Sequence, residues 1–113
     1  MTGLRTIVLF VLARQETRDP KAWRAAFYDQ HRHRVRAGCR SELVLANSQD
    51  PNEMFALLAF EDPERLRAYM ASAELRQALA DAQVVREAHH VLLPMGQHGG
   101  AAFPTRMPVG ETS

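Results

Sequence analysis

The sequence predicts an α+β domain of ferredoxin-like βαββαβ architecture, in which helices cover one face of a four-stranded antiparallel sheet. Short apolar runs that are typical of strands alternate with helical segments in the order β-α-β-β-α-β. Each helical segment begins with an Asp-Pro pair, and a turn separates the two central strands. The domain is expected to span residues 1-94, followed by a C-terminal extension over 95-113.

The first strand is predicted over Thr6 to Ala13, because this run is β-branched and apolar at both odd and even positions. Both faces of that strand should therefore be covered. Asp19 can cap a helix whose first residue is Pro20, and Gly38 supplies a left-handed stop. One helix is therefore predicted over about Pro20 to Ala37.

An antiparallel hairpin is predicted next, from strand-like runs at Ser41 to Asn47 and Met54 to Phe60. Pro51 presets the first dihedral angle of a turn between these runs, and Asn52 tolerates the second. The turn is therefore expected within residues 48-53.

The second helical segment is predicted in two consecutive pieces. Asp62 before Pro63 caps the first piece, and Ser72 caps the second. A last strand is predicted from Glu87 to Pro94, where a proline ends it.

The extension over 95-113 is rich in glycine and proline and differs in composition from the domain. Its sizeable apolar residues, Phe103, Met107 and Val109, are spaced irregularly. Such a segment is held only by docking into grooves, so we expect it to lie on its own subunit or on a partner subunit.

Composition and charge exclude several classes of protein. Hydrophobic residues make up 46% of the chain, too much for a disordered protein, and the formal net charge of +1 gives no field that would attract nucleic acid or a membrane. The apolar run Ile7 to Ala13 is too short to span a bilayer, and Cys39, the single cysteine, excludes an intrachain disulfide. A cytoplasmic location is the expectation. One basic cluster is interpreted as a solvated helix face: Arg32, His33, Arg34, Arg36 and Arg40.

The sheet face away from the helices should be covered by a second copy of the chain. The first strand and the run Met54 to Phe60 are apolar throughout, so a monomer would expose a large hydrophobic patch. A twofold homodimer that packs sheet against sheet removes that patch.

Three patterns resemble the dimeric α+β barrel superfamily, in particular the antibiotic-biosynthesis monooxygenases. They are Phe27-x3-His31-x3-Val35 ending at Gly38, the turn Asp50-Pro-Asn-Glu53 before an apolar strand, and Ser72-x-Glu-Leu-Arg76-x-Ala-Leu79. The resemblance covers about Thr6 to Leu93. It implies a ligand cavity between sheet and helices in each subunit, and activities that range from cofactor-independent oxygenation to polyketide cyclisation and haem degradation. The asparagine that the haem-degrading members carry on the first strand is missing here.

His31 is the candidate proton-transfer group. Four-residue steps place it on one helix face with Trp23, Phe27 and Val35, which we expect to line the cavity with Tyr69 and His90. A neutral imidazole there could remove a phenolic or enolic proton, so that the resulting anion reacts with O2 or with an internal carbonyl. The alternative is a histidine that is hydrogen-bonded within the core, and the aromatic residues also fit a plain core.

No metal or cofactor is predicted. The spacing of the histidines does not bring metal ligands to one face, and the sequence contains no phosphate-binding glycine loop. His89 and His90 are adjacent in a strand and should therefore point to opposite faces.

The sequence thus favours a cofactor-independent monooxygenase or cyclase that acts on a hydrophobic aromatic or polyketide-like molecule. The alternative is a non-catalytic ligand-binding or structural homodimer of the same fold.

Overall fold

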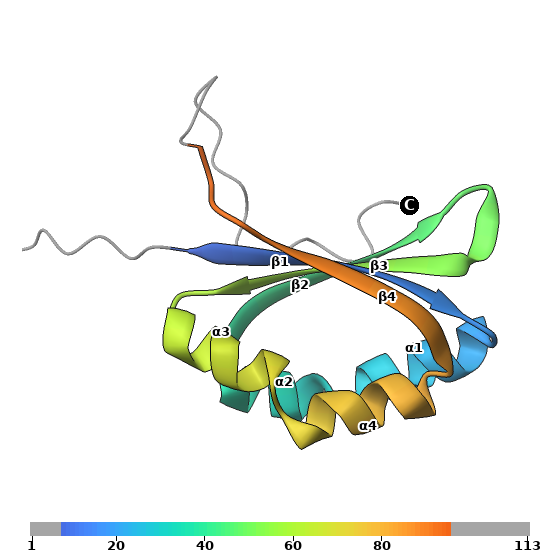
Figure 1. The fold of residues 1–113 in the computed structure, drawn as a ribbon, viewed down its shortest axis with the longest axis horizontal. Coiled ribbons are helices and arrows are strands. Elements are labelled where there is room, and N and C mark those ends of the chain that lie inside the picture. The colour runs from blue at the N-terminus through green and yellow to red at the C-terminus, as the bar shows by residue number, and fades with distance from the viewer. Residues whose placement is uncertain (1–7, 96–113) are drawn as a thin grey trace, which may run out of the picture.

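The computed structural model describes residues 8-95 as two layers, a sheet with helices on one side of it (Figure 1). The order of elements is β1 (Leu9–Thr17), α1 (Pro20–Asp29), α2 (His31–Ala37), β2 (Cys39–Asn47), β3 (Asp50–Phe60), α3 (Pro63–Met70), α4 (Ala73–Asp81) and β4 (Val84–Leu92). The predicted order of strands and helical segments is confirmed. Thr6, Ile7 and the extension from Gly96 onward lie outside the described residues, so what was expected of them stays a prediction.

The sheet is antiparallel, with strand order β2-β3-β1-β4. β1 lies in the centre, between β3 and β4, and the helices all pack below the same face (Figure 1). This is the ferredoxin-like arrangement. Because side chains alternate along a strand, Val11, Ala13 and Gln15 face the helices, whereas Phe10 and Leu12 face the open side of the sheet.

The predicted caps are confirmed. The carboxylate of Asp19 accepts hydrogen bonds from the first amides of α1, and that of Asp62 does the same for α3. Ser72 caps α4, and Gly38 ends α2 with a φ of 108°. The Asp-Pro pairs therefore fix where both helical segments start.

The helix predicted over Pro20 to Ala37 is interrupted at Gln30, whose φ of −90° and ψ of 2° separate α1 from α2. The carbonyl of Phe27, which an unbroken helix would pair with the amide of residue 31, accepts a hydrogen bond of 2.8 Å from Arg34 Nη2. The break thus gives the Arg34 side chain a backbone acceptor.

The hairpin turn lies within the predicted residues 48-53, but the assignment of Pro51 and Asn52 as its central residues is wrong. β2 and β3 are joined through Ser48 and Gln49, and Pro51 and Asn52 already lie in β3. The Asn47 side chain accepts a hydrogen bond from the Gln49 amide, which closes the turn earlier than expected. Pro51 is tolerated because pairing of β3 with β1 reaches only to Glu53.

β1 also continues beyond the predicted end at Ala13, through polar residues to Thr17. Arg14 forms an ion pair with Glu53 across the β1–β3 ladder, and the Gln15 side chain is hydrogen-bonded in the helix layer. Paired polar side chains thus keep the chain extended where hydrophobicity alone predicted a break.

Two apolar clusters join the layers. One gathers around Phe60 and Val11, which are the largest fully buried side chains, and the other around Trp23 and Met54. Phe27 packs against both clusters. A cavity between the layers is lined by residues of both clusters.

Candidate functional site

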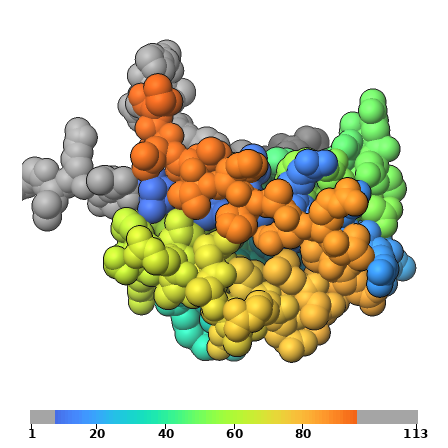
Figure 2. All heavy atoms as spheres, viewed as in Figure 1, coloured from blue at the N-terminus to red at the C-terminus, as the bar shows by residue number. Residues whose placement is uncertain are grey.

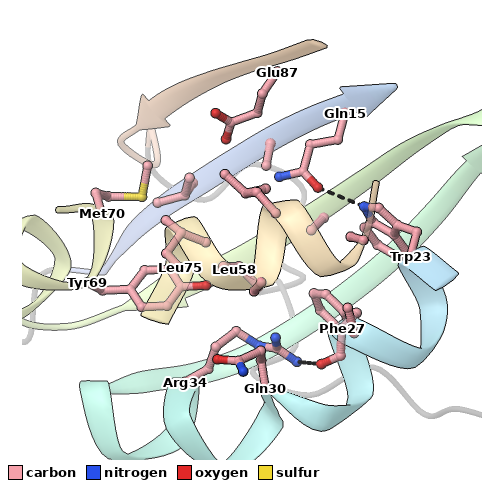
Figure 3. Close-up of a pocket in the computed structure, with 17 residues that line it drawn as sticks. Gln15, Trp23, Phe27, Gln30, Arg34, Leu58, Tyr69, Met70, Leu75 and Glu87 are labelled. Carbon is pink, nitrogen blue, oxygen red and sulfur yellow. Dashed lines mark hydrogen bonds between the residues drawn. The ribbon is translucent and has the colours of Figure 1, made fainter. Parts of the chain in front are cut away.

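A cavity lies between the sheet and the helices, as the resemblance implied. The empty space within it and at its mouth is about 570 Å³, open solvent included, and its wall is mostly apolar. The space-filling view is hollowed between β4 and α4 (Figure 2), and both strands and helices contribute to the wall (Figure 3). The polar residues of the wall are Gln15, Gln30, Arg34, Tyr69 and Glu87.

Arg34 is the main charged group of this wall. Its side chain is only 3% exposed, and its Nε and Nη2 donate hydrogen bonds of 2.7 and 3.2 Å to the two oxygens of Glu42 on β2. The Arg34 guanidinium carbon lies 3.6 Å above the centre of the Phe27 ring. These contacts fix the guanidinium in place and engage two of its three nitrogens, Nε and Nη2, while the Tyr69 side chain interacts with the guanidinium at the cavity.

Tyr69, on α3, is buried at the edge of the same space. Burial raises the pKa of its hydroxyl, and the positive charge of Arg34 acts in the opposite direction. The hydroxyl is therefore neutral at physiological pH and can donate a hydrogen bond. Figure 3 shows this hydroxyl directed into the cavity, above the Arg34 guanidinium.

The opposite end of the cavity carries Gln15 and Trp23. Trp23 Nε1 donates a hydrogen bond of 2.7 Å to Gln15 Oε1, and both residues are buried. The Trp23 ring stacks on Phe27, with ring centres 5.2 Å apart. An aromatic wall thus connects the Gln15 end to the Arg34 end.

Glu87, on β4, lies next to Gln15 because the two residues are register partners across the β1–β4 ladder. Its side chain is 25% exposed and lines the cavity. His89 Nδ1 lies 3.8 Å from Glu87 Oε2, which is longer than a hydrogen bond.

No protein-family model matches the sequence, and no curated protein matches it. SnoaB, a cofactor-independent oxygenase from Streptomyces nogalater, has a TM-score of 0.68 and 14% identity, over 82% of this chain and 97% of SnoaB. A Chloroflexus aurantiacus protein, provisionally assigned to the antibiotic biosynthesis monooxygenases, has a TM-score of 0.63 and 20% identity, over 81% and 97% of the two chains. A protein from Mycobacterium tuberculosis has a TM-score of 0.64 and 23% identity, over 80% of this chain and 97% of its own.

The chain has the antibiotic biosynthesis monooxygenase fold. The resemblance seen in the sequence is therefore confirmed for the fold. At these identities the likeness concerns the fold alone, and the chemistry of this chain depends on the residues of its own cavity.

The structure places the predicted site residues differently. Trp23, Phe27 and Tyr69 line the cavity as expected. The expectation that His31 faces the cavity is wrong, because its side chain is 58% exposed and its Nδ1 lies 3.3 Å from Glu42 on the surface side. Val35 is also misplaced, with 52% exposure.

Two features explain these positions. In a continuous helix a four-residue step advances about 400°, so repeated steps drift about 40° each from the starting face. The break at Gln30 also puts His31 and Val35 on a separate helix, α2. Steps of four, three and four residues keep one face and lead to Phe27, Gln30 and Arg34, which all line the cavity. The sequence therefore contained a signal for Arg34, and its assignment to a solvated basic face is wrong.

His90 is not a cavity residue either. It pairs with Leu12, which faces the open side of the sheet, whereas His89 pairs with Ala13 on the helix side. The opposite orientation of the two histidines is as expected, but the choice of His90 is wrong. His33 packs near the Tyr69 ring, and its Nε2 is buried without a hydrogen-bond partner in the structure.

Within residues 8-95, no three histidine, cysteine, aspartate or glutamate side chains gather in a way that could hold a metal ion. No helix of this same range is long and apolar enough to cross a membrane. Cys39 is buried, and burial raises the pKa of its thiol to about 11, so it is a neutral thiol at physiological pH.

Proposed function

We propose that this chain binds an aromatic or polyketide-like small molecule in the cavity and oxygenates it without a cofactor. One observation carries the proposal: a buried, tightly held guanidinium, Arg34, faces a mostly apolar cavity that has only a few polar groups in its wall. A fixed positive charge in such surroundings stabilises a negative charge that develops on a bound molecule.

The reacting group that fits is a phenol or an enol. With its oxygen at the Arg34 guanidinium and near the Tyr69 hydroxyl, it loses its proton to solvent more easily than in water, because the anion gains a positive partner and a hydrogen-bond donor. Trp23 and Phe27 provide stacked aromatic surface for the rings of the molecule.

The anion is electron-rich at a ring carbon and supplies the electrons for O2. One electron passes to O2, and the resulting superoxide and organic radical combine to a peroxide at that carbon. After the peroxide takes up a proton, loss of water leaves a carbonyl. In sum, a CH2 group and O2 give a C=O group and one molecule of water, so no external reductant is required.

Cyclisation is the related outcome of the same anion. If the bound molecule has its own carbonyl within reach, the carbon attacks it, and a new carbon–carbon bond forms without consumption of O2. The chemistry of the ligand decides between these outcomes, since Arg34 and Tyr69 stabilise the same anion in both.

A non-catalytic ligand-binding protein is the second candidate. The placement of His31 favours it, because the predicted base is on the surface and not beside the cavity. A binding protein would use Arg34 only to hold an acidic oxygen.

Oxygen uptake distinguishes the two candidates. Hydroxylated anthrones and quinols are incubated with the chain in an oxygen-electrode cell, and products are separated by chromatography. We expect O2 uptake above the uncatalysed rate, equal to one O2 per carbonyl formed, and its loss in Arg34→Met. Saturable binding with neither O2 uptake nor ring closure would establish the binding protein.

We further propose that the open sheet face forms a homodimer interface. This face presents apolar side chains of all four strands, among them Leu45 at 47% and Leu92 at 43% exposure. A solitary subunit would expose this patch to water. Light scattering at micromolar concentration should give a dimer, and a monodisperse monomer would disprove the interface. The cytoplasmic location stays a prediction.

A further inference from the structure

We propose that Gln15 and Glu87 form a second polar subsite, at the end of the cavity opposite Arg34, which binds a hydroxyl group of the ligand. The inference rests on the proposed ligand cavity and extends it. The ligand would carry an acidic oxygen at one end and a hydrogen-bond-donating hydroxyl at the other, with aromatic rings between them.

The Gln15 amide has one possible orientation. Trp23 Nε1 can only donate a hydrogen bond, so the atom of Gln15 that lies 2.7 Å from it must be the amide oxygen. The amide nitrogen with its two N–H donors therefore points away from Trp23. Figure 3 shows this nitrogen on the cavity side, toward Glu87.

Glu87 provides the acceptor beside this donor. It is the register partner of Gln15, so the two side chains leave neighbouring strands on the same sheet face. The nearest basic group is His89 Nδ1, at 3.8 Å from Oε2. The carboxylate therefore keeps acceptor capacity for a ligand, and a hydroxyl, which both donates and accepts, matches the pair.

The two polar ends face each other across an apolar middle. Figure 3 shows Gln15 and Glu87 on one side of the cavity and Arg34 with Gln30 on the other, with Leu58 and Leu75 between them. A ligand with one polar end would leave one of the two subsites without a hydrogen-bond partner. The two subsites would therefore favour a ligand with polar groups at both ends and would determine which end lies over Arg34.

The test compares three probes of nearly the same shape: 2-hydroxyanthraquinone, 2,6-dihydroxyanthraquinone and 2-hydroxy-6-methoxyanthraquinone. Quenching of Trp23 fluorescence, from the one tryptophan of the chain, reports binding at pH 6.5. We expect the dihydroxy probe to bind about tenfold more tightly than the other two, because a hydrogen bond to a carboxylate is among the stronger ones. The methoxy probe keeps an oxygen at this position but has no second donor and is one methylene larger, and the monohydroxy probe, which is smaller, controls for this difference in size.

Glu87→Leu should reduce the tenfold preference to less than twofold, and Glu87→Gln, which keeps the shape and one acceptor, should reduce it to about threefold. Glu64→Leu is the matched control, since it removes the same charge from a carboxylate on α3 that is 81% exposed and does not line the cavity. It should keep the tenfold preference. Melting curves establish that each variant is folded.

Equal binding of the three probes to the wild-type chain, or a preference that survives Glu87→Leu, would overturn the subsite. Failure of the proposed oxygenation gives a different result, namely a preserved preference without O2 uptake. Conversely, O2 uptake from an anthrone together with no preference would refute the subsite alone.

Discussion

The pair of Arg34 and Glu42 should be strongly coupled, and its two single variants should differ in stability. Glu42→Leu leaves the Arg34 cation in the protein interior, where 3% of its side chain is exposed, without its carboxylate. Arg34→Met leaves Glu42, which is 17% exposed and lies 3.3 Å from His31, with both water and the imidazole as partners. The first change should therefore be the more damaging.

The expected sizes follow from these contacts. Removal of one partner of a buried pair costs about 3–5 kcal/mol. Arg34 keeps the Phe27 carbonyl and ring, and Glu42 is partly hydrated, so we expect about 2–3 kcal/mol for Glu42→Leu. Arg34→Met removes hydrogen bonds but leaves no fully buried charge without a partner. We therefore expect it to lower the free energy of unfolding by about 1–2 kcal/mol.

The double variant Arg34→Met/Glu42→Leu should be close to the wild type, within about 1 kcal/mol, because two apolar side chains replace a desolvated pair. Urea unfolding followed by circular dichroism, at one protein concentration, gives the four free energies of the cycle. Additive effects of the two single variants, or less than about 0.5 kcal/mol lost in Glu42→Leu, would refute the assignment of Arg34 as a buried, Glu42-held cation.

Three further predictions concern residues around the site. His31→Ala should change the free energy of unfolding by less than about 0.5 kcal/mol, because surface ion pairs contribute little to stability. It should leave O2 uptake unchanged, because His31 is 58% exposed and does not line the cavity. Loss of O2 uptake in this variant would show that His31 takes part in the reaction. Gly38→Ala should lower the free energy of unfolding in urea by about 1–2 kcal/mol, because the φ of Gly38 is 108° and an added Cβ would lie 3.1 Å from the Arg65 side chain. An unchanged free energy would contradict the expected backbone strain. Burial raises the Cys39 pKa from 9.0 to about 11, so the folded chain holds a proton that the unfolded chain loses. The contribution of the Cys39 thiol to the free energy of unfolding should be complete below pH 9 and should be lost between pH 9 and 11. Cys39→Ala should therefore reduce the fall of the urea midpoint over this pH range. An identical fall in both proteins would exclude Cys39 as its source.

The fold could be predicted because its signals are local. The Asp-Pro pairs at residues 19 and 62 and the glycine at 38 act within one helical turn, and the structure has the caps where they were expected. The central residues of the hairpin turn were misassigned because Pro51 is compatible with a turn and with the start of a strand. The decisive hydrogen bond, from the Gln49 amide to Asn47, depends on which residues pair across the hairpin.

The site could be predicted only in part. Trp23 and Phe27 were found because one four-residue step stays on the same helix face. Arg34 was missed because a buried arginine needs a partner, and Glu42 is supplied by β2, eight residues later, after the chain has turned. Glu87 depends on the β1–β4 register, which the spacing of residues along one strand does not contain.

The central claim is that the cavity beside Arg34 is the ligand site, and a titration of Trp23 fluorescence with 2-hydroxyanthraquinone tests it most directly. Trp23 is the one tryptophan of the chain and lines the cavity, so the signal is specific to the site. We expect saturable quenching with one ligand per chain, and at least tenfold weaker binding in Arg34→Met/Glu42→Leu, the variant expected to keep the fold. Absence of saturable quenching, or equal affinity in the two proteins, would contradict the claim.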